Sequence, residues 1–91
     1  MDVPTAGSRV RVLNTKDKCV WIRFTAPTAN SGLTYVGDSA VSATNGYVLG
    51  AAGGGDATVE LEFRPGSMSM DTFYIDAATN GDDVAWVAIL R

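Results

Sequence analysis

Hydrophobic and polar residues alternate along most of the chain with a period of two. The run "CVWIRFT" (residues 19–25) sets Val20, Ile22 and Phe24 on one face, against Cys19, Trp21, Arg23 and Thr25 on the other. The runs "RVRVL", "VELEF" and "FYIDA" alternate in the same way. A period of two is the pattern of β-strands with one buried face, so these four runs are predicted to be strands.

The last run, "VAWVAIL" (residues 84–90), is apolar at every position. Such a run indicates either a central strand or a strand that a neighbouring subunit covers. We expect the subunit interface to use the following residues: Trp21, Tyr74, Val84, Trp86, Ala88 and Leu90. For Trp21 and Tyr74 two other readings remain open, namely cover by loops of the same domain and an exposed aromatic patch that binds sugar.

Turn signals separate the runs, and no window of ten or more residues carries an apolar stripe at helical spacing without a Gly, Pro or Asn inside it. Six to eight short strands separated by turns predict an all-β sandwich or small barrel of antiparallel strands. No composition shift marks a second domain. Residues 9–91 are therefore expected to form one domain, and residues 1–8, with Pro4 and Gly7, an N-terminal arm.

The glycine-rich stretch from Thr34 to Asp56 is predicted to turn corners. Four residues are expected to form its turns: Gly37, Asp38, Asn45 and Gly46. Asn-Gly is the strongest short signal for a type I′ reversal, and a Gly before Asp-Ser suits a strand end because Gly accepts a positive φ. The glycines of "GAAGGGD" lack the Lys-Ser/Thr and the following helix of a phosphate-binding loop, so they are read as a flexible link.

The composition removes several function classes. The 91 residues contain no histidine and one cysteine, Cys19, which excludes Ser-His-Asp and Cys-His nucleophiles, four-ligand Cys/His zinc sites and a disulfide within one chain. We expect Cys19 to be a small buried residue. Glu60 and Glu62 share one strand face, which is better explained as an exposed face than as a glycosidase pair. We expect no catalytic site and no cofactor.

Five aspartates could in principle form a calcium site: Asp38, Asp56, Asp76, Asp82 and Asp83. They lack the spacing of a calcium-binding loop, and adjacent residues such as Asp82 and Asp83 point to opposite faces of a strand. We therefore expect no specific metal site, although interfacial calcium remains open. The chain lacks the long apolar run of a membrane helix and the apolar core of a secretory signal, so a soluble protein made in the cytosol is expected.

Charge is distributed unevenly along the chain, whose net charge is −3. Residues 1–30 carry a net charge of +3 and the rest a net charge of −6. Such an asymmetry favours docking of a basic segment on an acidic surface. The expected contact residues are Arg9, Arg11, Lys16 and Lys18. The basic residues form no dense cluster, so nucleic acid is not an expected partner.

The segment "TYVGDSAVSATNGYVL" (residues 34–49) resembles a "VYVGDSxVSxxNGYxL" motif of small tailed-bacteriophage virion proteins. The resemblance extends over residues 20–90, from "CVWIRFTAP" through an Asn-Ser-Gly turn to the closing strands "FYIDAATNGDDVAWVAIL". Its specific part is residues 35–49. One departure is "GAAGGGD", where relatives carry Pro-Gly with a hydroxyl residue.

The resemblance implies a jelly-roll-like β-sandwich that decorates or cements the outside of a phage head, commonly as a homotrimer. The implied partners are copies of the same chain and the major capsid protein, and the implied location is the capsid surface after synthesis in the host cytoplasm. A module of a phage tail, spike or fibre, structural or binding host glycan, is the alternative. In both cases the chain would not be an enzyme, and neither a membrane nor a small molecule is an expected partner.

Overall fold

A computed structural model describes residues 1–27, 29–50 and 58–90. These residues contain seven strands, within the six to eight that the sequence predicts, and one 3₁₀ turn. The elements are β1 (Val10–Arg11), β2 (Cys19–Thr25), β3 (Thr34–Gly37), β4 (Tyr47–Leu49), β5 (Thr58–Glu62), η1 (Met70–Thr72), β6 (Tyr74–Ala77) and β7 (Ala85–Leu90). The prediction of a small all-β domain is confirmed.

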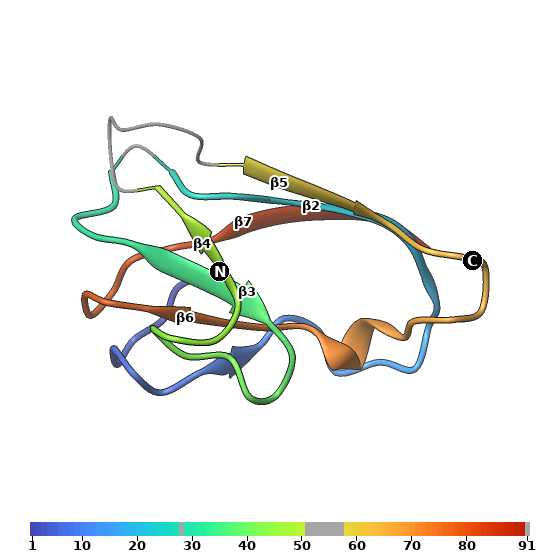
Figure 1. Ribbon diagram of the computed structural model, residues 1–91, viewed down its shortest axis with the longest axis horizontal. Coiled ribbons are helices and arrows are strands. Elements are labelled where there is room, and N and C mark those ends of the chain that lie inside the picture. The colour runs from blue at the N-terminus through green and yellow to red at the C-terminus, as the bar shows by residue number, and fades with distance from the viewer. Residues whose placement is uncertain (28, 51–57, 91) are drawn as a thin grey trace.

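The strands form two antiparallel sheets that face each other as a sandwich (Figure 1). One sheet has the order β1-β6-β3-β4 and the other the order β5-β2-β7. Strand β2 lies in the centre of the three-stranded sheet and pairs with β5 on one side and β7 on the other. The final strand, β7, is therefore an edge strand, which contradicts the first of its two predicted placements, that of a central strand. Its cover by a neighbouring subunit stays a prediction.

The core lies between the two sheets and follows the predicted alternation. Ile22 and Phe24 of β2 and Ile75 of β6 are fully buried. The ring of Phe73 packs edge-on against Phe24 at 5.8 Å between centroids, and Phe63 lies 5.6 Å from Phe73 on another side. Aromatic pairs at these separations add roughly 0.5–1.5 kcal/mol each beyond the apolar area that they bury.

Cys19 is an exception to the alternation. The sequence pattern places it on the same face as Trp21, yet its side chain is fully buried. A register shift between Cys19 and Trp21 in the β2–β7 pairing accounts for this, because a bulge changes which side a residue faces. Burial raises the pKa of the Cys19 thiol above its ordinary value, as expected of a small buried residue.

Residues 1–8 contain no strand longer than a single bridge, but they are not a detached arm. Val3 is fully buried, and its N–H donates to the carbonyl of Asp82 at 2.8 Å. The N–H of Gly7 donates to the carboxylate of Asp76 at 3.0 Å. The segment therefore completes the domain, because Val3 adds to the core and Gly7 provides a partner for a buried acid.

The predicted reversal at Asn45-Gly46 is shifted by two residues. Ser42 and Asn45 exchange two backbone hydrogen bonds, of 2.9 and 3.2 Å, so the central residues of the turn are Ala43 and Thr44. A type I′ turn needs positive φ at both central residues, and no described residue other than glycine has one. Gly46 has φ +136° and leads into β4, where an added Cβ would lie 2.8 Å from the carbonyl oxygen of Val36.

The predicted turn at Gly37-Asp38 is present, although positive φ is not its reason. The carboxylate of Asp38 accepts a hydrogen bond from the N–H of Ala40 at 2.9 Å, which closes a short Asp-led turn. Gly37 lacks positive φ and is needed for space, since a Cβ there would lie 3.2 Å from a methyl carbon of Val41. The predicted link "GAAGGGD" (residues 50–56) lies, apart from Gly50, outside the described residues.

Thr34 offers a first test of the packing. Its side chain is fully buried, and its hydroxyl makes no hydrogen bond to any part of the chain that the structure describes. Replacement by the isosteric valine removes a buried polar atom without opening a cavity, so we expect Thr34→Val to stabilise the fold by about 1 kcal/mol. Urea unfolding followed by tryptophan fluorescence measures this change, and a loss of stability would show that the hydroxyl has a partner.

Candidate assembly surface

Strand β7 divides its side chains between the core and the solvent. Val84, just before the strand, is fully buried, and Trp86 and Ala88 are partly buried against the core. Val87 and Ile89 point the other way, with 53% and 57% of their surface exposed. Val84 is covered by the chain's own core, so the prediction that its side chain forms a subunit interface is wrong. Trp86 and Ala88 are only partly buried, and their place in an interface stays a prediction.

Leu90, the last interface residue predicted from this run, is 39% exposed at the end of β7. The apolar residues that face solvent from β7 are thus Val87, Ile89 and Leu90, of which the sequence reading named only Leu90. A run that is apolar at every position contains no polar residue to mark its outer face. The pairing with β2 supplies that information, since it aligns Val87 with exposed Arg23.

The outer face of the three-stranded sheet changes character from one edge to the other. Register places Glu62, Trp21 and Ile89 in one row across β5, β2 and β7. The next row holds Glu60, Arg23 and Val87. One edge of this face is therefore acidic and the opposite edge apolar, and the central strand joins the two; we call Trp21, Val87 and Ile89 the apolar strip.

Arg23 is held in the middle of this face. Its Nε donates to the carboxylate of Glu60 at 3.1 Å, and its guanidinium carbon Cζ lies over the ring of Trp21 at 5.6 Å from the centroid. Both side chains of the ion pair are about half exposed, so the pair adds little to folding stability. Trp21 borders a hollow of about 420 Å³, whose other lining residues are Val20, Glu62, Phe63 and Ile89.

Tyr74 does not join Trp21 in one patch. Tyr74 belongs to β6 of the four-stranded sheet, and its hydroxyl accepts two hydrogen bonds from exposed Arg11, at 2.6 and 3.0 Å. Trp21 belongs to the other sheet, and each of the two side chains faces away from the core. The predicted pairing of the two aromatics in a single exposed surface is therefore wrong, because the sandwich places them on opposite sides.

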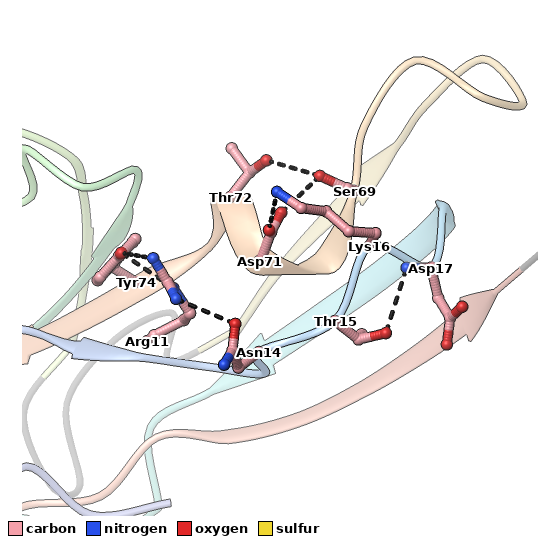
Figure 2. A network of polar contacts seen from close by, with 9 residues as sticks. All are labelled: Arg11, Asn14, Thr15, Lys16, Asp17, Ser69, Asp71, Thr72 and Tyr74. Carbon is pink, nitrogen blue, oxygen red and sulfur yellow. Dashed lines mark hydrogen bonds and ion pairs between the residues drawn. The ribbon is translucent and has the colours of Figure 1, made fainter.

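The four predicted contact residues, Arg9, Arg11, Lys16 and Lys18, are all exposed. Figure 2 shows how two of them are held. Arg11 donates to Tyr74 and also to Asn14 at 3.1 Å, so neutral groups orient its charge without cancelling it. Lys16 forms an ion pair of 2.7 Å with Asp71, which leaves less of its charge for a partner.

Asp71 belongs to the same polar network (Figure 2). The hydrogen bonds from Lys16 and Ser69 lower the pKa of the Asp71 carboxyl below its ordinary value. A carboxyl with a lowered pKa favours the folded state above its unfolded pKa, and this contribution is lost as the pH falls through the lower, folded pKa. The contacts join the loop after β1 to η1.

The buried carboxylates have structural partners. The carboxylate of Asp82 accepts hydrogen bonds from the N–H groups of Ser31 and Gly32, at 2.9 and 2.8 Å. Asp76 accepts from Gly7 and from the N–H of Ala77 at 2.8 Å. Within the described ranges, no three Asp, Glu, His or Cys side chains gather as metal ligands would.

Comparisons with known proteins give no further guide. No family model, no curated protein and no solved structure matches this chain. Among the described residues, no helix is long and apolar enough to cross a lipid bilayer.

Proposed function

We propose that the chain is a structural virion protein that decorates or cements the outer surface of a bacteriophage head as an oligomer. The observation that carries the proposal is the apolar strip of Trp21, Val87 and Ile89, which lies beside a free sheet edge. An exposed apolar surface next to an unpaired edge is typical of a chain that assembles. The resemblance of residues 34–49 to phage virion proteins supports the choice of partner.

The two outer faces of the sandwich suit two different contacts. Arg9 lies just before β1 of the four-stranded sheet and Arg11 lies within β1, whereas Glu60 and Glu62 face outward from β5 of the other sheet. The side of the sandwich that carries Arg9 and Arg11, which we call the basic side, would dock on acidic capsid surface. The apolar strip would contact other copies of the chain. A protein that binds the closed shell and not its opened form stabilises the shell by mass action.

Co-sedimentation with phage heads tests the docking. The probe is heads of the encoding phage, assembled without decoration proteins. We expect Arg9→Ser/Arg11→Ser to weaken head binding by about tenfold at low salt, with the difference shrinking as salt screens the charges. Arg9→Ser and Arg64→Ser form a matched pair, since each removes one exposed positive charge. Equal binding by these two variants would contradict docking through the basic side.

A module that binds host glycan is the second candidate, and the hollow beside Trp21 and Glu62 favours it. An indole next to a carboxylate offers a stacking surface and a hydrogen-bond acceptor for a sugar ring. Titration with host surface polysaccharide, followed by tryptophan fluorescence, separates the two candidates. A saturable fluorescence change that Trp21→Ala abolishes would support the glycan module, and head binding without such a change would support the cement protein.

A further inference from the structure

The free edge of β7 exposes a definite set of backbone groups. Before the strand, the N–H of Val84 donates to the carbonyl of Met1 at 2.9 Å, while the backbone of Asp83 bonds to the side chain of Asn30 on the opposite side. Backbone groups of successive strand residues alternate between the two sides. Trp86 and Ala88 therefore direct N–H and C=O groups to the same side as Val84, away from β2 and toward no strand among the described residues.

The other sheet edges are protected in ways that β7 is not. The edge strands β1 and β4 contain only two and three residues. The edge strand β5 presents Glu60 and Glu62 to solvent, and charge on an edge discourages pairing with another chain. By contrast, β7 has six residues with neither charge nor proline. It is the edge best suited to accept a further strand.

We propose that β7 pairs with β7 of a second copy, antiparallel, about a two-fold axis. The three-stranded sheets of the two copies would then join into one continuous sheet, with the β5 strands at its outer edges and the β7 strands at its centre. Two apolar strips would meet on the outer face, and the acidic residues of β5 would stay far from the contact. This inference specifies the self-association on which the proposed function rests.

The N-terminal residues determine the register of this pairing. Met1 occupies the position opposite Val84, so a partner strand must end before it. An axis at Val87 would place Leu90 of the partner subunit opposite Val84, where Met1 already lies. An axis at Ala88 avoids this overlap and sets Trp86 opposite Leu90 of the partner subunit and Val87 opposite Ile89 of the partner subunit.

A two-fold contact of this kind differs from the threefold ring that the phage resemblance implies. Each copy has one such edge, and pairing about a two-fold axis uses both edges at once, so a third copy has no place on it. The solution mass of the chain therefore distinguishes the two arrangements. Light scattering after size exclusion, over a range of protein concentrations, is expected to give a dimer.

The variant Val87→Lys tests the surface. It places a charge beside the axis on a side chain that is 53% exposed, so the fold is expected to survive while dimer affinity falls by at least about tenfold. Val48→Lys is the matched control, because Val48 is 48% exposed on β4 of the other sheet. A dimer that both variants weaken equally would overturn the proposal. Circular dichroism checks that each variant is folded.

Hydrogen exchange tests the register. The amide protons of Trp86 and Ala88 are expected to exchange more slowly as protein concentration rises, and this protection should disappear in Val87→Lys. A trimer, a monomer at every concentration, or a dimer in which these two amides stay unprotected would each overturn the inference. A dimer that fails to bind phage heads would instead contradict the proposed function alone.

Discussion

Replacing Phe24 by alanine is expected to lower the free energy of unfolding by about 3–5 kcal/mol. Phe24 is fully buried near the end of β2, and its ring meets Phe73, just before β6, at 5.8 Å between centroids. Truncation removes this contact and leaves a cavity that two sheets held by their own ladders cannot fill. A domain of this size has a total stability of roughly 5–14 kcal/mol, so the loss is a large fraction of it.

Urea unfolding followed by circular dichroism measures the effect of Phe24→Ala. Val87→Ala is the matched control, because it truncates an exposed apolar residue of the neighbouring strand, directly across the sheet from Arg23. We expect that control to change stability by less than about 0.5 kcal/mol when measured on the monomer. A loss below about 1 kcal/mol for Phe24→Ala would mean that the space between the sheets closes up around the smaller side chain.

The alternation of apolar residues predicted the strands and most of the core because one buried face imposes a period of two. It placed Ile22 and Phe24 inside and Arg23 outside, as the structure has them. It placed Cys19 on the wrong side because a bulge inserts one residue into β2, and no residue type marks that insertion. It could not orient β7, since a run without polar residues contains no sign of which side meets water.

The turns show the same limit. Asn-Gly is favoured at a reversal for its tolerance of positive φ, but the chain turns two residues earlier, at Ala43 and Thr44. Gly46 is still needed there, because the backbone of β3 passes too close for any side chain. Local preference thus identified the segment that turns, and packing against β3 selected the residues that form the turn.

The candidate surface could be predicted only in part. The exposed basic residues and Trp21 follow from sequence, because charge and alternation decide their exposure. The contact between Arg11 and Tyr74 joins residues 63 positions apart, and the free edge of β7 depends on a strand order that alternation does not specify. The burial of Val3 could not be predicted for a different reason, because a single apolar residue beside Pro4 has no period that indicates a buried face.

Replacing Asp82 by alanine is expected to lower the free energy of unfolding by about 3 kcal/mol, because two backbone N–H groups lose a charged acceptor. Asp82 is only 6% exposed, and its carboxylate accepts hydrogen bonds from the N–H groups of Ser31 and Gly32, which lie in the loop before β3. Its backbone carbonyl also accepts from Val3. Asp82 therefore joins that loop and the N-terminal segment at the point where β7 begins.

Two further variants separate the hydrogen bonds from the charge. Asp82→Asn keeps one acceptor oxygen in place, so its stability should fall between those of the wild-type chain and Asp82→Ala. Asp83→Ala removes the same charge from the adjacent exposed position and is expected to change stability by less than about 0.5 kcal/mol. Amide exchange at Ser31 and Gly32 should accelerate in Asp82→Ala only. Equal losses of stability for Asp82→Ala and Asp83→Ala would contradict this expectation. They would show that net charge, and not the hydrogen bonds from Ser31 and Gly32, determines what this acidic pair contributes to stability.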